Sequence, residues 1–209
     1  MYKLEYLWLD GCTPTQIRYK TKVVKKPLKV PEWSFSPIWG FDGSSTEQAP
    51  GNDSEIYIKP VALYKDPFRK NLDNSYLVLC DTWLPDGSPH PDNTRVKALE
   101  IFNDEKVLTE EPMFGLEQEF FFENCDTNKP LGFPDKGLPE KQGQYYCSVG
   151  ANNCFGRDIA ETILENSIFC DLNITGLNFE VAPGQCEFQL CDSGIKASDD
   201  LLLLRYIMV

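Results

Sequence analysis

The sequence predicts a protein of mixed α and β structure, and two observations lead to this prediction. The first third of the chain reads as short strands separated by turn residues, with only weak helical periodicity. Beyond a stretch rich in Pro, Gly and Asp at residues 84–93, helical and strand patterns follow one another. This stretch is therefore the expected boundary between a strand-rich part and a mixed part.

Each expected element follows from its own pattern of residues. Apolar and β-branched segments bounded by turn signals predict strands at residues 4–9, 16–24, 56–61, 76–80 and 113–123. Apolar residues recurring every three or four positions predict helices at residues 95–107 and 158–171. The elements of the second half are separated by long connections, notably residues 128–143.

The last element is expected to be a helix that begins at Ser198, Asp199 and Asp200. A hydroxyl and two acids suit a helix N-terminus, where they accept hydrogen bonds and complement the helix dipole. The segment then continues as apolar residues to Val209 without Gly, Pro or a polar last turn. We therefore expect the chain to be truncated in the middle of an element.

Composition excludes several classes of function. The chain has 209 residues and a net charge of -12, which argues against nucleic-acid binding and against binding to an anionic membrane surface. Its longest apolar stretch lies within residues 201–209 and is too short to span a bilayer. Eight cysteines without C-x-x-C spacing, and no signal peptide, favour reduced thiols in the cytoplasm.

The single histidine and the one basic run both read as ordinary surface features. His90 is expected in an exposed, turn-rich loop, so a Ser-His-Asp triad and a zinc site are both disfavoured. The basic run is interpreted as a solvated strand or loop face rather than as a nucleic-acid site. It consists of Lys20, Lys22, Lys25, Lys26 and Lys29.

Four carboxylates carry the strongest functional signal. Glu117 and Glu119 lie two residues apart in an expected strand, so their side chains point to the same face. Glu180 and Glu187 flank Pro183-Gly184, a turn signal. If that turn centres a hairpin, these two glutamates face each other across it.

Such a grouping of like charges needs compensation. Carboxylates about 4 Å apart repel by ~4 kcal/mol at an effective dielectric of about 20. Each glutamate taken singly reads as a solvent-facing strand residue, and protonation of one of them is another way to relieve the repulsion. Several converging oxygen donors are better matched to a hard divalent cation, Mg²⁺ or Mn²⁺.

With both glutamate pairs located, the chain resembles glutamine synthetases of the eukaryotic type. The resemblance rests on the two glutamate segments, 114–122 and 178–188, and on further short motifs in the same order along the chain. These are Leu7–Gly11, Lys20–Lys22, Trp39–Thr46, Asp66–Arg69, Leu77–Cys80, Pro89–Pro91, Tyr145–Cys147 and Gly156–Asp158.

The resemblance implies a fold, a reaction and partners. The implied fold is α+β, with an N-terminal β-grasp domain at residues 1–88 and a truncated catalytic domain at residues 89–209. The implied reaction is ATP-dependent condensation of glutamate with ammonium through a γ-glutamyl phosphate, in homo-oligomeric rings whose active sites form between subunits. Residues 33–38 form an insertion without a clear counterpart in many relatives.

The resemblance also implies roles for individual residues. Glu119, Glu180 and Glu187 match the ligands of one divalent ion, and Glu117 matches a ligand of a second. Asp42 matches a residue that binds and deprotonates ammonium, although Asp-Gly is by itself a common turn dipeptide. The nucleotide is expected to contact Glu117 and the segment Glu187, Phe188, Gln189, Leu190, Cys191 and Asp192.

Three functional hypotheses stay open from the sequence. The first is a glutamine synthetase, whose second metal site, glutamate-binding loop and phosphate-binding arginines would lie beyond Val209. The second is a non-catalytic, truncated paralogue that binds metal or modulates the rings of a complete synthetase. The third is a related carboxylate-amine ligase that uses another amine.

Overall fold

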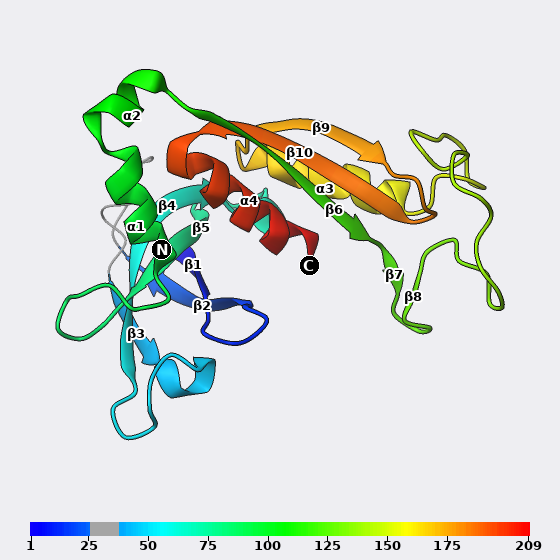
Figure 1. Ribbon diagram of the computed structural model, residues 1–209. Coiled ribbons are helices and arrows are strands. Elements are labelled where there is room, and N and C mark those ends of the chain that lie inside the picture. The colour runs from blue at the N-terminus through cyan, green and yellow to red at the C-terminus, as the bar shows by residue number, and fades with distance from the viewer. Residues whose placement is uncertain (26–37) are drawn as a thin grey trace. The chain divides into compact units, whose positions relative to one another are not determined.

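The computed structural model describes residues 1–25 and 38–209, in two compact units, Met1–Pro112 and Met113–Val209 (Figure 1). The expected boundary near residue 88 stays a prediction. Most of the expected insertion at residues 33–38 lies outside the described residues, as do Lys26 and Lys29. Among the described helices, none is both long and apolar enough to cross a membrane.

The first unit is built on a five-stranded sheet in the order β2-β1-β5-β4-β3. Its strands are β1 (Tyr2–Leu9), β2 (Ile17–Val24), β3 (Trp39–Asp42), β4 (Glu55–Lys65) and β5 (Ser75–Trp83). β1 and β5 pair in parallel at the centre, and the other pairs are antiparallel. The four strands expected in this region are confirmed, whereas β3 was not expected.

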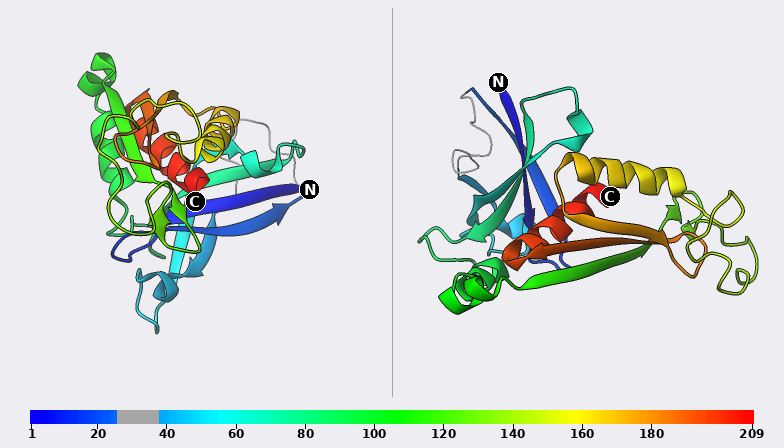
Figure 2. Two further views of the ribbon diagram at one scale, coloured as in Figure 1. Left: turned by 90° about the vertical axis from the view of Figure 1, so that its right-hand side faces the viewer. Right: turned by 90° about the horizontal axis from the view of Figure 1, so that it is seen from above.

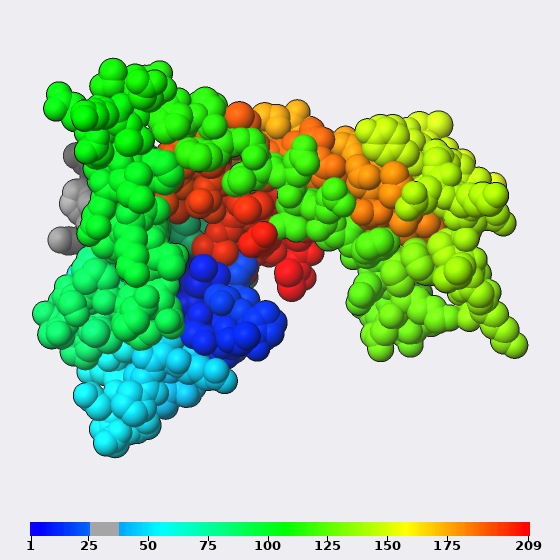
Figure 3. All heavy atoms as spheres, in the orientation of Figure 1, coloured from blue at the N-terminus to red at the C-terminus, as the bar shows by residue number. Residues whose placement is uncertain are grey.

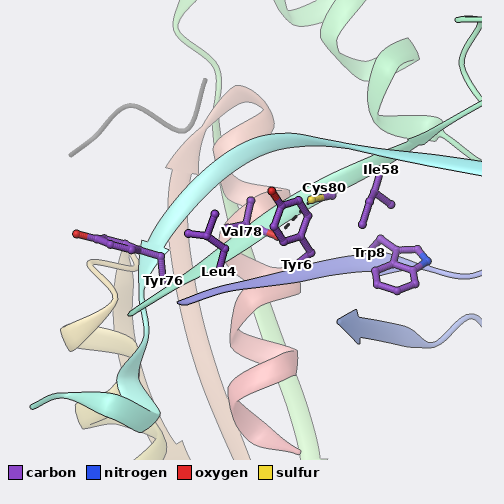
Figure 4. Close-up of a cluster of buried hydrophobic side chains, with 7 residues drawn as sticks. All are labelled: Leu4, Tyr6, Trp8, Ile58, Tyr76, Val78 and Cys80. Carbon is purple, nitrogen blue, oxygen red and sulfur yellow. Dashed lines mark hydrogen bonds between the residues drawn. The ribbon is translucent and has the colours of Figure 1, made fainter. Parts of the chain in front are cut away.

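The central strands are apolar because both of their faces are covered. Eight of the nine residues of β5 are buried, as is typical of a strand inside a sheet that packs on both sides. One face carries the core cluster drawn in Figure 4, which consists of Leu4, Tyr6, Trp8, Ile58, Tyr76, Val78 and Cys80. The edge strand β2 instead alternates exposed and half-buried residues.

Lysines on β2 are more constrained than a solvated face would require. Lys20 Nζ donates a hydrogen bond to Gly40 O at 2.7 Å and lies 3.5 Å from the centre of the Trp39 ring. Lys22 Nζ lies 4.6 Å from the same ring. These two half-buried residues of the basic run lie on a strand, as expected, and they also join β2 to β3 through cation–π contacts.

Short helices follow the strands of the first unit. They are η2 (Gly43–Thr46), η3 (Pro67–Arg69), α1 (Thr94–Phe102) and α2 (Glu105–Glu110). The prediction of a single helix at residues 95–107 is thus wrong, because the helix is interrupted between Phe102 and Glu105. Asp104 caps α2 as a new helix, since its side chain accepts a hydrogen bond from Lys106 N.

His90 is buried, so its expected exposure is wrong. Its side chain sits in a loop but is 6% exposed, and its Nε2 donates to Gln48 O at 2.7 Å. Nδ1 accepts a hydrogen bond from Asp92 N at 3.2 Å. Both ring nitrogens are therefore engaged in holding two loops together, which a turn-rich sequence pattern does not reveal.

Asp66 is a buried carboxylate that ties three segments of the first unit together. It accepts hydrogen bonds from Ser75 Oγ at 2.7 Å and Phe68 N at 3.0 Å, and it pairs with Lys3 at 3.2 Å and Arg69 at 3.1 Å. Burial acts to raise the pKa of Asp66, but the Ser75 hydroxyl and the Lys3 charge outweigh it, so the pKa lies below its ordinary value.

The Asp66 contacts predict a pH-dependent part of the stability. A carboxyl whose pKa is lowered by folding stabilises the protein above its unfolded pKa of about 3.9, and this contribution is lost as the pH falls through the folded pKa. We expect Asp66→Asn to lower the free energy of unfolding by about 1–3 kcal/mol at pH 7, and the deficit to shrink from about pH 4 downwards. Urea unfolding at a series of pH values tests this, and a deficit that stays constant to pH 2 contradicts it.

The second unit has a three-stranded antiparallel sheet covered on one face by two helices (Figure 2). The sheet order is β6-β10-β9, with β6 (Met113–Phe121), β9 (Ile174–Phe179) and β10 (Gln185–Ser193). The helices are α3 (Arg157–Phe169) and α4 (Gly194–Met208), and a small hairpin is formed by β7 (Glu123–Asn124) and β8 (Lys129–Pro130). The expected strand at 113–123 and helix at 158–171 are confirmed.

α4 begins earlier than expected. It starts at Gly194 after Ser193, not at Ser198, and both Asp199 and Asp200 are buried within it. Asp200 accepts hydrogen bonds from Lys196 Nζ at 2.6 Å and from Asn173 N at 3.1 Å. The acids that read as a helix start are therefore partners in tertiary contacts, which a local pattern does not distinguish.

Candidate metal centre

The pairing of β6 with β10 brings glutamates of the two expected pairs together. Glu117 and Glu119 share a face of β6, and Glu119 lies directly opposite Glu187 in the ladder. Glu117 lies opposite Gln189. Side chains on the other face of β6 and β10, including Phe120 and Phe188, stack in the core at a ring-centre distance of 6.0 Å.

The expected hairpin register is wrong by two residues. Glu187 pairs with Asn178, and Glu180 N donates to Gln185 O at 2.9 Å, so Glu180 and Glu187 are not opposite each other. Because side chains alternate along a strand, a shift of two residues leaves every side chain on its expected face. Glu180 therefore still lies on the same side of the sheet as Glu187.

Three carboxylates converge on this face. One carboxylate oxygen from each of Glu119, Glu180 and Glu187 lies within 4.8 Å of the other two, whereas Glu117 is outside the group. We call these three residues the carboxylate cluster. Burial, together with the neighbouring Glu187 and Glu119 carboxylates, raises the pKa of Glu180. Three oxygen donors at this spacing match what a hard divalent cation requires.

Glu187 differs from several other buried carboxylates that the structure describes, which form ion pairs. Asp10 pairs with Arg18 at 2.7 Å, Asp66 with Lys3 and Arg69, and Asp200 with Lys196 at 2.6 Å. Glu187 is 5% exposed, yet across residues 1–25 and 38–209 no Lys or Arg forms an ion pair with any member of the carboxylate cluster. A buried charge without a cationic partner is costly, so the cluster has the charge of a cation site.

The β10 segment expected to contact a nucleotide has two faces with different surroundings. Phe188 and Leu190 are 0% and 2% exposed, on the core side of the sheet. Asp192 lies on that side too, where Lys196 at 3.0 Å and the Asn173 amide hold it. Glu187, Gln189 and Cys191 occupy the opposite face. The nucleotide assignment stays a prediction, and on the carboxylate side Phe188 and Leu190 would contribute only backbone atoms.

Asp42 lies in the first unit, at the end of β3. It caps η2 and accepts hydrogen bonds from Ser44 Oγ at 2.7 Å and Ser45 Oγ at 2.5 Å. The hydrogen bonds from Ser45, Ser44 and Ser54 lower the pKa of Asp42 to about 2. The exposed side chain is therefore a stable anion, which suits attraction of a small cation.

The sequence did not predict that amide side chains of this site donate hydrogen bonds to the carboxylates. Gln185 and Asn178 were not singled out, and Gln189 was expected only as a nucleotide contact. The period-two series Gln185, Glu187, Gln189 on one strand is the signal that places these amides on the carboxylate face. Met113, Phe114 and Phe121 on the neighbouring strand β6 are exposed. Figure 3 shows part of this green segment at the surface.

Comparison with known proteins gives consistent similarities. The model of the glutamine synthetase β-grasp domain matches residues 1–85. The chain is 47% identical over 205 residues to a chloroplastic glutamine synthetase of Daucus carota, covering 98% of this chain and 46% of that protein. Cytosolic isozyme 1-1 of Oryza sativa subsp. japonica is 45% identical, with 98% and 56% covered. The chain thus spans about half the length of these relatives.

A solved structure supports the same fold. The chain superimposes on a glutamine synthetase of Plasmodium falciparum with a TM-score of 0.70 and 16% identity, covering 100% of this chain and 44% of that one. The expected α+β class, with a β-grasp domain followed by part of a catalytic region, is confirmed.

Proposed function

We propose that this chain, which carries the glutamine synthetase β-grasp domain and is homologous over 98% of its length to plant glutamine synthetases, provides part of an active site for glutamine synthesis. The reaction would be the ATP-dependent condensation of glutamate with ammonium through a γ-glutamyl phosphate. The observation that carries this proposal is the carboxylate cluster, where a buried glutamate without a cationic partner lies directly opposite a second one.

The carboxylate cluster has the donor chemistry for Mg²⁺ or Mn²⁺. Glu119, Glu180 and Glu187 would hold one ion through carboxylate oxygens, and Glu117, next along the same face, would contribute to a second. A divalent ion there would offset the negative charge of ATP, which a chain with a net charge of -12 needs help to bind. The backbone and exposed side chains of residues 187–192 would form one wall of the nucleotide site.

Asp42 would act on the amine substrate. Its carboxylate stays ionised because three serine hydroxyls hold its pKa low, so it would attract ammonium by charge. A carboxylate can also accept a proton from ammonium as nitrogen attacks the acyl phosphate. The proposal includes a location in the cytoplasm. It also includes assembly into rings, in which Asp42 of one subunit would reach the active site of the next.

The decisive experiment measures turnover and metal binding separately. Protein isolated from its native source, at the length it has there, is assayed with glutamate, ammonium, ATP and Mg²⁺. It is expected to form glutamine and phosphate in equal amounts, with no product when any one component is left out. Mn²⁺ binding without turnover would refute the catalytic proposal and favour the non-catalytic, metal-binding alternative. Turnover with a different amine in place of ammonium would instead identify a related ligase.

A further inference from the structure

Each carboxylate of the cluster accepts a hydrogen bond from a different side-chain amide. Gln185 Nε2 donates to Glu119 Oε2 at 2.9 Å, and Asn178 Nδ2 donates to Glu180 Oε1 at 3.0 Å. Gln189 Nε2 donates to Glu187 Oε1 at 2.6 Å. We propose that these three amides are positioning residues that fix the carboxylates in the arrangement that binds the divalent ion, an inference that rests on the proposed function.

The amides reach the carboxylates because of strand geometry. Gln185 and Gln189 flank Glu187 at intervals of two residues on β10, so all three side chains share one face. Asn178 lies directly opposite Glu187 on β9 and two residues before Glu180. Donors and acceptors are therefore neighbours along or across the strands.

Two of the amides are also linked to each other. Gln189 Nε2 donates to Asn178 Oδ1 at 3.0 Å as well as to Glu187. An amide oxygen only accepts and its nitrogen only donates, so this bond turns the Asn178 nitrogen towards Glu180. Gln189 thus controls the orientation of both Glu187 and, through Asn178, Glu180.

Neutral donors suit a cation site better than lysine or arginine would. An ionised carboxylate has about four acceptor positions, so one amide hydrogen bond leaves most of them available. A cationic side chain would neutralise the cluster and compete with a metal ion, which is the arrangement that Asp66 and Asp200 have. Amides orient the oxygens while the negative charge remains.

An independent observation concerns Gly176, which lies opposite Gln189 in the β9–β10 ladder. A Cβ atom at position 176 would lie 2.1 Å from Gln189 Oε1. The Gln189 amide therefore occupies the space that any other residue at 176 would fill. The atoms that a new Cβ would meet belong to the end of the flexible Gln189 side chain. The Gly176→Ala variant should therefore fold, with the Gln189 amide displaced.

The test compares Mn²⁺ binding by the full chain and three variants, using electron paramagnetic resonance. Gln189→Leu and Gly176→Ala are each expected to weaken Mn²⁺ binding about 10- to 100-fold, the usual effect of losing an outer-shell hydrogen bond. The spectrum of bound Mn²⁺ should broaden in both, because the ligand oxygens are no longer fixed. Gln118→Leu is the matched control, since the Gln118 side chain on the same sheet contacts Arg205 on α4 and the Glu119 backbone oxygen but none of the cluster's carboxylate groups.

The outcomes separate the positioning role from the proposed metal site. Weakened binding in both variants, with Gln118→Leu and the metal-free thermal stabilities near those of the unaltered protein, supports the positioning role. Binding in both variants at the unaltered affinity and with an unaltered spectrum overturns it while leaving the metal site intact. Absence of Mn²⁺ binding by the unaltered protein overturns the metal site, and the positioning role with it.

Discussion

Glu187→Gln is expected to weaken Mn²⁺ binding by more than the roughly 100-fold that marks the upper end of outer-shell effects. Glutamine keeps the size of the side chain but removes the charge from the most buried member of the carboxylate cluster. It also removes a like charge directly opposite Glu119, which should stabilise the metal-free protein by about 0.2–1 kcal/mol. The sign of the stability change should therefore depend on the metal.

Thermal unfolding with and without Mn²⁺ measures this reversal. Metal bound only to the folded state stabilises the unaltered protein in proportion to the logarithm of its concentration, and the variant should lose that increment. Glu123→Gln is the control, because Glu123 is an exposed glutamate of β7 outside the cluster. A Glu187→Gln variant that binds Mn²⁺ as tightly as the unaltered protein would show that the cluster is not a metal site.

Asp42→Asn is expected to reduce the rate of glutamine formation about 10²- to 10⁴-fold, the range for loss of a general base, and to leave Mn²⁺ binding unchanged. Asparagine keeps one oxygen that can accept the hydrogen bonds of Ser44, so η2 should retain its cap. Since the pKa of Asp42 is about 2, its ionisation should cause no change of rate with pH above about pH 4. Steady-state assays over a range of ammonium concentrations and pH test both points.

Asp86 provides a matched control for Asp42. It makes the same local contacts, accepting from Ser88 N at 2.9 Å and Ser88 Oγ at 2.6 Å, and the Ser88 hydrogen bonds lower its pKa too. Asp86→Asn should leave the rate unchanged. If Asp42→Asn also keeps the full rate, Asp42 is a turn residue of the same kind as Asp86, and the ammonium role fails.

The features that sequence predicted correctly depend on local geometry. Glu117 and Glu119 share a face because a strand repeats every two residues, and this holds wherever the strand pairs. The position of Glu180 on the same side survived an error of two residues in the hairpin register for the same reason. Periodicity therefore identified the face of the site without the correct pairing.

The features that sequence did not predict depend on long-range packing. The opposition of Glu119 and Glu187 joins segments that no local pattern aligns, since it is fixed by how β6 lies along β10. The burial of His90 depends on Gln48, which lies far from it in the chain. The start of α4 was misplaced because Asp200 meets Asn173 and Lys196 instead of capping a helix.

The parallel pairing of β1 with β5 sets an order for folding during synthesis. Lys3 on β1 aligns with Ser75 on β5, so the centre of the first sheet unites its earliest residues with residues made much later. Until β5 leaves the ribosome, β1 has only β2 as a partner, and an isolated two-stranded hairpin is marginally stable in water. The apolar side chains of β1 therefore lack their second neighbouring strand until most of the unit has been made, and an exposed apolar segment of this kind is prone to aggregation.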